Sequence, residues 1–325
     1  MGRTVGTRVL ERSIIKHLGK SRGVGVGCDF SVLGDGKTVL SMGFSDSGYD
    51  TSALSGEAKI STGEMALIRA INNFACSGAT PKEMTVSIQA GESCPEQTLR
   101  DEMLSMNRAA GERGISIIGG NTVIRTEGDG CGITVSLFGA VTDKDMIRFD
   151  KKTVPEDLIF VAGYTGHMGA SIAAIESTDK LRERLPFSYI KGALMDASDL
   201  ESADITRSLI DAGAYYVHDI TYGGVYRAIL ETGIRFGMGT DIIHEKLPIR
   251  QDTIEICEVL GLNPYEILGT GGVIGVCHPD EKEKIDEALK KLRVPYGLAG
   301  KLTVEKKRVV RSEKNPMERS ITFYE

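Results

Sequence analysis

The chain has 325 residues, of which 41% are hydrophobic and 26% are charged, and its formal net charge is −6. This composition is typical of a soluble globular protein, and the length predicts two domains of roughly 150 residues each. The negative net charge argues against a nucleic-acid-binding protein or a protein that binds anionic membranes.

Two further classes are excluded by the distribution of residues. No apolar run approaches the roughly 18 residues that a transmembrane helix needs, and Met1–Lys20 has charges throughout and lacks the apolar core of a signal peptide. The six cysteines include no C-x-x-C pair, so we expect free thiols and a cytoplasmic protein.

The first half of the chain predicts helices on a sheet. Helical spacing at Thr4–Leu18 precedes a glycine-rich stretch at Gly23–Phe30. In chain order, the next elements are a strand at Thr38–Met42, a polar loop at Ser45–Thr62, a helix at Gly63–Ser77, a strand at Met84–Ala90, a helix at Pro95–Arg113, and strands at Ile115–Ile118 and Ile133–Val141. This order predicts one layer of helices on a sheet.

A domain boundary is expected near Pro155, which divides the chain into 1–154 and 155–325. In the second half, the predicted helices are Met168–Glu176, Tyr189–Ala212, Gly223–Phe236, Gln251–Leu260 and Pro279–Leu292, and the predicted strands are Leu158–Ala162, Ala214–Val217 and Gly272–Cys277. The last twenty or so residues are charged and are expected to form an edge strand and a tail. The fold class predicted for the whole chain is a mixture of α/β and α+β.

Glycine turns offer candidate binding sites. In Val217–Val225, which reads V-H-D-I-T-Y-G-G-V, a strand ends at Asp219 and two glycines open a helix. Backbone N–H groups at such a helix start favour anions, although a helix capped by Thr221 explains the same pattern. The turn Gly163–Gly169 also joins a strand to a helix, but it does not match the dinucleotide-binding fingerprint.

Isolated carboxylates and amides are the other candidates. Asp29 and Asp46 follow a glycine-rich stretch and a strand, where they are either Mg²⁺ ligands or ordinary turn residues. Asn72 and Asn73 lie on a predicted helix, and only one of them can face inward. Asn121 follows two glycines in what we expect to be a loop.

Taken together, the order of these motifs resembles the aminoimidazole ribonucleotide (AIR) synthase, or PurM-like, superfamily, which includes HypE, thiamine-monophosphate kinase and selenophosphate synthetase. Ala70–Pro81 is similar to the family's V-N-D-L-x-x-M-G-A-x-P, and Gly119–Thr122 to its G-G-D-T. Ser45–Ser47 resembles its T-D-S step and Gly163–Ala170 its G-T-x-G-D-H-G-x-A turn. His218–Gly224 resembles the R-D-P-T-R-G-G of the HypE branch.

The resemblance implies a fold and a ligand. The family has an N-terminal α/β domain that dimerises through its sheet and a C-terminal α+β domain, with ATP and Mg²⁺ in the cleft between them. Carried onto this sequence, it implies a metal site at Asp29 and Asp46. The implied ligand-binding residues are Asn72, Asn73, Gly119, Gly120, Asn121, Thr122, Gly166, Asp219, Gly223 and Gly224. It assigns no catalytic residue here.

The sequence departs from the family motifs at two positions where the family has a negatively charged side chain. The aspartates of N-D-L and G-G-D-T are replaced by Asn73 and Asn121, and an amide neutralises no phosphate charge. The chain ends Phe323-Tyr324-Glu325, without the cysteine that ends HypE.

Three hypotheses follow. The first is an ATP-dependent enzyme that activates an amide or carbonyl oxygen by phosphoryl transfer. The second is a HypE-like accessory factor that acts on a protein partner in metalloenzyme maturation. The third is a catalytically degenerate dimeric module that binds a small molecule.

Overall fold

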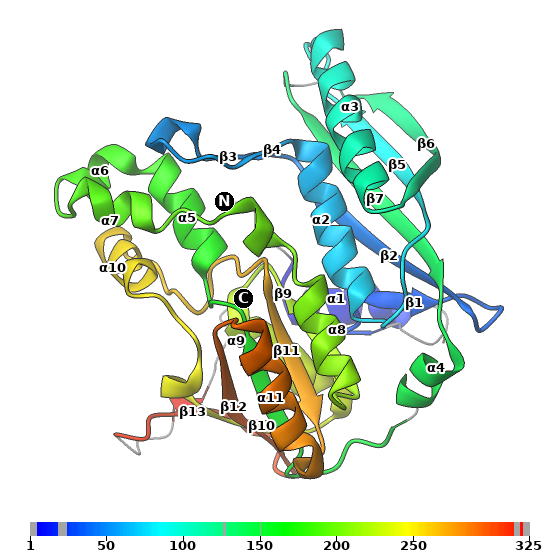
Figure 1. Cartoon of the computed structure of the whole chain (residues 1–325), viewed down its shortest axis with the longest axis vertical. Coiled ribbons are helices and arrows are strands. Elements are labelled where there is room, and N and C mark those ends of the chain that lie inside the picture. Colours follow the sequence, from blue (N-terminus) through cyan, green and yellow to red (C-terminus); the bar gives the residue numbers. More distant parts are fainter. Residues whose placement is uncertain (1–4, 19–24, 126–127, 150, 315–318, 321–325) are drawn as a thin grey trace.

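The computed structural model describes residues 5–18, 25–125, 128–149, 151–314 and 319–320 (Figure 1). A five-stranded sheet is built from the first half of the chain, and a seven-stranded sheet is built from the second half. The mixed α/β class predicted from the sequence is confirmed. The boundary expected at 154/155 falls between the last element of the first half, α4 (Asp143–Phe149), and the first strand of the second half, β8 (Leu158–Ala162).

The first sheet has the strand order β1-β2-β7-β5-β6. Its strands are β1 (Phe30–Val32), β2 (Thr38–Ser45), β7 (Cys131–Ala140), β5 (Glu83–Ala90) and β6 (Ser116–Ile124). Two helices, α2 (Thr62–Ala75) and α3 (Glu96–Glu112), cover one face. A Cβ atom on Gly43 would lie 2.2 Å from the carbonyl oxygen of Ala66, so the glycine lets α2 pack directly on β2.

Neither α2 nor α3 covers the opposite face of this sheet (Figure 1). Because side chains alternate along a strand and Gly43 faces α2, its neighbours Met42 and Phe44 point to the open face. They are 54% and 46% exposed. On the edge strand β6, exposed Val123 pairs with Gln89 and adds to the open face, whereas Ile124 pairs with buried Ala90 on the side of the helices.

The second sheet has the order β14-β13-β10-β12-β8-β11-β9. Its other strands are β9 (Tyr216–Ile220), β10 (Gly239–Ile243), β11 (Gly272–Cys277), β12 (Tyr296–Thr303), β13 (Arg308–Arg311) and β14 (Arg319–Ser320). One face packs on α9 (Gly224–Phe236), and the other packs on α8 (Ala203–Asp211) and α11 (Lys282–Leu292). Strand β11 is buried along its whole length because helices cover both faces.

Smaller elements complete the chain. A cluster of helices lies to the left in Figure 1. It comprises α5 (His167–Glu176), α6 (Thr178–Arg182), α7 (Phe187–Gly192) and α10 (Gln251–Leu260). Helix α1 (Thr7–Ser13) lies near β1, and a two-stranded ribbon pairs β3 (Tyr49–Asp50) with β4 (Lys59–Ile60).

The two halves are joined by buried polar contacts. Asn72 on α2 donates to the carbonyl oxygen of Leu200 at 2.9 Å, and its Oδ1 accepts from the backbone N–H of Ser202 at 2.9 Å. The Tyr49 hydroxyl donates to the carbonyl oxygen of Met195 at 2.8 Å. Each half thus satisfies polar groups of the other, which fixes their relative position.

Most predicted helices and strands are confirmed, but several predictions are wrong. The stretch Tyr189–Ala212, expected to be mostly helical, contains most of α7, a 3₁₀ turn at Ala197–Leu200, and α8. Strands β10 and β12 were not predicted, and the polar loop expected at Ser45–Thr62 contains the β3–β4 ribbon. Parts of three predicted segments lie outside the described residues: Thr4, Gly23 with Val24, and the C-terminal residues 315–318 and 321–325.

The prediction that Gly119–Thr122 forms a loop is also wrong, because this segment lies within β6. A Cβ atom on Gly120 would lie 2.0 Å from the carbonyl oxygen of Val86 on β5. The register also shifts between Met84 and Thr85 of β5, whose partners are Ile117 and Gly119. The glycines therefore serve a β-bulge and a close approach of two strands.

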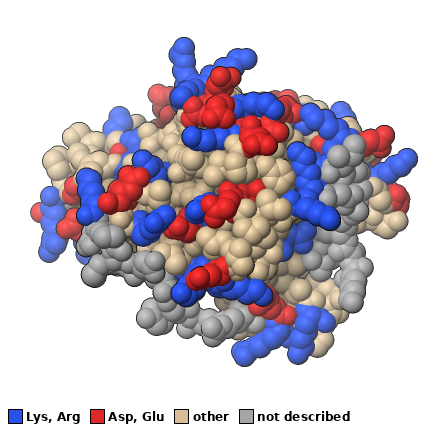
Figure 2. Space-filling model, turned by 90° about the horizontal axis from the view of Figure 1, so that it is seen from below, with Lys and Arg blue, Asp and Glu red and all other residues tan. Residues whose placement is uncertain are grey.

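The surface agrees with the composition. In the view of Figure 2, lysine and arginine side chains are interspersed with aspartate and glutamate over one face, and neither sign dominates it. Among the described residues, no helix is both long and apolar enough to span a membrane.

Candidate functional site

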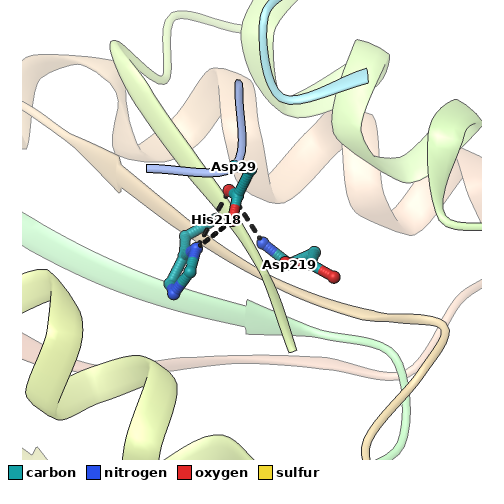
Figure 3. Close-up of side chains that lie close together, drawn as sticks. All are labelled: Asp29, His218 and Asp219. Carbon is teal, nitrogen blue, oxygen red and sulfur yellow. Dashed lines mark hydrogen bonds and ion pairs between the residues drawn. The ribbon is translucent and has the colours of Figure 1, made fainter. Parts of the chain in front are cut away.

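A buried contact between the two halves is the centre of the candidate site. Asp29, just before β1, lies against His218 on β9, with 2.7 Å between His218 Nδ1 and Asp29 Oδ1 and 2.9 Å to Oδ2 (Figure 3). The side chain of His218 is only 7% exposed and that of Asp29 only 6%. A charge-assisted contact at this depth is screened little by solvent.

The next residue on β9 adds a second carboxyl group. The backbone N–H of Asp219 donates to Asp29 Oδ2 at 3.3 Å, while the carboxyl group of Asp219 points away from this contact (Figure 3). Asp219 is 5% exposed, and its Oδ2 is buried without a hydrogen-bond partner among the described residues. Burial and the charge of Asp29 raise the pKa of Asp219 well above its usual value.

The other ring nitrogen of His218 is also engaged. Nε2 lies 3.1 Å from Glu231 Oε2, and Arg227, one turn earlier on α9, donates to Glu231 Oε1 at 2.8 Å. Burial opposes a charge on His218, but Asp29 and Glu231 outweigh it and raise the pKa of the imidazole well above its usual value. The pKa of Glu231 would be raised by burial, but His218 and Arg227 lower it overall. The cluster is therefore a chain of alternating charges.

These side chains border a pocket that we call the central pocket, with a volume of about 410 Å³. A pocket of this size is within the range that holds small ligands. Its walls come from both halves of the chain and from α1. They comprise Leu10, residues 25–31, Leu40 to Met42, Asn73, His218, Asp219, Thr221, Tyr222, Arg227 and Glu231.

The donor set of this pocket fits a divalent cation. One ligand atom from each of Asp29, His218 and Asp219 lies within 4.8 Å of the others. Carboxylate and amide oxygens are ligands that Mg²⁺ accepts, and Asn73 lines the same pocket. The unpartnered Oδ2 of Asp219 is the oxygen that most needs a cation or a proton. Both His218 nitrogens are already engaged, so the carboxyl groups are the natural ligands.

The structure brings only some of the sequence-predicted residues to this pocket. Asp29, Asn73 and Asp219 line it. Asp46 is exposed and follows the last residue of β2, whereas Asp29 precedes Phe30, which pairs with Ser41 nearer the middle of β2. Asp46 and Asp29 are thus separated along β2 and do not form one metal site within a single chain.

The two remaining asparagines lie elsewhere. Asn72 is 1% exposed, and both polar atoms of its side chain are used in the link to Leu200 and Ser202, which leaves neither for a ligand. Asn121 pairs with Ser87 across β6 and β5, at the far edge of the first sheet from β1. Its neighbours Gly119, Gly120 and Thr122 share that strand and do not line the central pocket.

The predicted glycines have structural roles. Gly223 and Gly224 adopt φ angles of 86° and 64°, and a Cβ atom on Gly224 would lie 2.4 Å from the carbonyl oxygen of Tyr265. The N–H of Gly224 donates to the carbonyl oxygen of Thr221, so this helix start is partly satisfied internally, and the side chain of Thr221 does not cap it. Gly166, with φ 67°, lies against the carbonyl oxygen of Pro264.

Sequence reasoning missed Glu231 and Arg227 and did not assign a role to His218. The i, i+4 spacing of Arg227 and Glu231 on a predicted helix was a visible signal of an ion pair. Their contact with His218 depends on how α9 packs beside β9, which no local pattern reveals.

Comparisons with known proteins agree with this architecture. The sequence model of the family "AIR synthase related protein, N-terminal domain" matches residues 46–141. The carbamoyl dehydratase HypE of Azotobacter vinelandii is 26% identical over 229 residues, which span 70% of this chain and 65% of that protein. Residues 46–141 thus match the AIR synthase-related family, and the chain is similar in sequence to HypE over 70% of its length.

Solved structures show the same fold over nearly the whole chain. HypE in a HypE–HypF complex superposes with a TM-score of 0.74 and 21% identity, covering 97% of this chain and 99% of that one. HypE in complex with ATP superposes with a TM-score of 0.70 and 18% identity, covering 98% and 94%. At these identities the structural matches establish the fold, and the chemistry must be argued from the site.

Proposed function

We propose that this protein binds ATP in the central pocket with a divalent cation and activates an amide or carbonyl oxygen by phosphoryl transfer, as a HypE-like protein. The observation that carries the proposal is the pair of buried carboxyl groups, Asp29 and Asp219, at the pocket wall. Unpaired buried carboxyl groups are costly, and a cation with a polyphosphate would satisfy the free Oδ2 of Asp219.

In this proposal the residues at the wall of the central pocket have distinct roles. Asp219 and Asp29 would hold the cation, which would supply neutralisation of phosphate charge. His218 and Glu231 keep Asp29 fixed, because His218 is held on both ring nitrogens. Asn73 donates through Nδ2 to the carbonyl oxygen of Met42 at 2.8 Å, so it borders the pocket in a fixed orientation. Phosphoryl transfer depends mainly on such positioning and charge neutralisation.

The relatives support this class of chemistry. The curated relative is named a carbamoyl dehydratase, and a solved relative is a complex with ATP. Another solved relative is a HypE–HypF complex, which supports a protein partner in metalloenzyme maturation for this chain as well.

We further propose a homodimer formed through the open face of the first sheet. Exposed Met42 and Phe44 on β2 and Val123 on β6 contribute large apolar side chains to this face. Clustered exposed apolar side chains of this kind mark interaction surfaces.

A second candidate function is a dimeric binding module without phosphoryl transfer. Asn73 favours it, because an amide at the pocket wall contributes no negative charge to a cation site. In this case the pocket binds a nucleotide or another phosphorylated ligand, and no phosphate is transferred.

Calorimetry with ATP, with and without Mg²⁺, tests the proposal. We expect Mg²⁺-dependent heat of binding, followed by accumulation of ADP or AMP when an amide substrate is supplied. Binding without product over hours would favour the binding module. No binding at millimolar ATP would refute the ATP-dependent function.

A further inference from the structure

A second pocket lies behind the wall of the central pocket and is unused by the proposed chemistry. We call it the aromatic pocket, and its cavity is about 90 Å³. It lies between residues 27–30, α4, the start of β9 and the end of α9. The segment Gly27–Phe30 lines both pockets, so it forms the wall between them.

Rings give this pocket firm walls. Phe30 and Phe149 lie with their ring centroids 5.1 Å apart, and Tyr216 and Phe236 meet edge to face at 5.0 Å. All four residues line the cavity. Aromatic pairs at these separations are favourable contacts that hold the rings in place. The apolar part of a small ligand would lie against them.

Three cationic side chains surround the same cavity: Arg148, Lys151 and Arg235. Within the described chain, none of the three has a carboxylate within ion-pair distance, whereas many other lysines and arginines do. The single carboxylate of the lining is Asp29, and His218 already holds both its oxygens. The lining therefore carries three positive charges that form no direct ion pair with a described carboxylate.

Arg148 is the decisive member. It is 8% exposed, and its Nη2 and Nη1 donate to the backbone carbonyl oxygens of Cys76 and Tyr215 at 3.0 and 3.3 Å. Its Nε is buried without a partner. Asp145 is near in space, but its Oδ2 accepts from Thr142. The charge of Asp145 favours the charged guanidinium but makes no direct ion pair with it, so an anion in the adjoining cavity would reduce the remaining cost of burying Arg148.

We propose that the aromatic pocket binds the anionic group, a phosphate or a carboxylate, of a small molecule with a flat apolar part. Arg148 and Arg235 hold the anion because a guanidinium matches the geometry of both groups, and Lys151 adds a third charge. The cavity is smaller than the roughly 150 Å³ that encloses a benzene molecule, so it takes the anionic group while the apolar part rests on the rings. This site is independent of the function proposed for the central pocket.

Binding can be followed by fluorine NMR of the full chain labelled with 4-fluorophenylalanine, titrated with inorganic phosphate and, separately, with benzoate. Phe149 and Phe236 line the cavity, whereas Phe160 is buried in the second sheet and serves as an internal reference. We expect saturable shifts at Phe149 and Phe236 with at least one anion. Phosphate alone would identify a phosphate monoester as the ligand class, and benzoate alone would identify a carboxylate.

Matched variants locate the site. Arg235→Met and Lys151→Met should each weaken binding by about tenfold or more, because each removes a charged donor. Lys152→Met makes the same change of charge at an exposed neighbour outside the pocket and should bind as the wild type does. Arg235 is exposed, so its variant tests binding even if Arg148→Met fails to fold.

Two results would overturn the inference. One is the absence of any shift at Phe149 and Phe236 with both anions at millimolar concentration. The other is an equal loss of affinity in Lys151→Met and Lys152→Met, which would reduce the effect to general surface charge.

Discussion

Asp29 and His218 are separated by 189 positions in the chain, yet Asp29 Oδ1 and His218 Nδ1 lie 2.7 Å apart. This contact joins the segment before the first sheet to β9, an edge strand of the second sheet. It forms one wall of the central pocket and leaves the neighbouring Asp219 with an unpartnered oxygen. The proposed function depends on this arrangement.

Asn73 and Asn121 stand where the similar family motifs have aspartates, and we expect substitution by aspartate to affect ATP binding differently at the two positions. Asn73→Asp adds a carboxylate at the wall of the central pocket and should strengthen Mg²⁺-dependent ATP binding by about tenfold. Asn121 lies on β6, four strands from β1 at roughly 4.8 Å per strand, so within one chain Asn121→Asp should leave affinity unchanged.

Calorimetry of both variants checks this expectation. A gain in Asn121→Asp alone would mean that a second subunit brings Asn121 to the pocket. Unchanged affinity in Asn73→Asp would show that the nucleotide does not bind in the central pocket.

Asn72 should matter for stability and not for ligand binding. Asn72→Leu leaves the carbonyl oxygen of Leu200 and the N–H of Ser202 without partners, which should lower the free energy of unfolding by about 3 kcal/mol. Urea unfolding measures the loss, and Asn107→Leu, at an exposed position of α3, is the control. Equal stability of the two variants would argue against the link between the halves.

His167 should make stability depend on pH. It is 4% exposed, and burial, with a smaller effect of Arg250, lowers its pKa to about 4. Between the unfolded pKa of about 6.5 and the folded pKa, the unfolded chain binds a proton that the folded chain does not. Stability from this group is thus complete above about pH 6.5 and falls toward pH 4, by about 3 kcal/mol in all.

Urea unfolding of the wild type and of His167→Gln at pH 7.5 and pH 5 tests this sign. The wild type should lose more stability on acidification than the variant, because only the wild type carries the buried imidazole whose pKa is lowered, whereas the neighbouring Arg250, Asp252 and Asp196 are present in both proteins. An equal loss in both would place the acid sensitivity elsewhere.

The open face of the first sheet should mediate dimer formation. Met42→Glu combined with Phe44→Glu places two charges on it and should give a monomer by light scattering at micromolar concentration. Leu104→Glu adds a charge at a position that is 63% exposed on α3, which covers the other face, and should remain dimeric. A monomeric wild type would contradict the proposed dimer.

The sequence predicted helices and strands better than it predicted which side chains meet in the folded chain. Helices such as α2 and α9 follow from apolar periodicity, and β8 and β11 follow from short apolar runs. Strands β10 and β12 lack such a signal, since charged or glycine residues interrupt them. Asp29 and Asp219 were found through motifs, because family resemblance carries positions that periodicity does not.

The remaining parts of the site depend on tertiary packing. Glu231 reaches His218 only because α9 returns beside β9, and Arg148 reaches its cavity only because α4 packs near β1 and β9. Asn72 and Asn73 are neighbours in sequence, yet one links the two halves and the other lines the pocket. The rotation of α2 about its axis determines which asparagine faces the second half and which faces the pocket, and tertiary contacts set that rotation.

The most direct test is a crystal structure with a non-hydrolysable ATP analogue and Mn²⁺ in place of Mg²⁺, located by anomalous scattering. We predict a manganese peak at coordination distance, about 2.1 Å, from Oδ2 of Asp219, with Asp29 as its neighbour and the phosphates in the central pocket. An analogue bound elsewhere, or a central pocket without manganese at saturating concentration, would contradict the proposed nucleotide site.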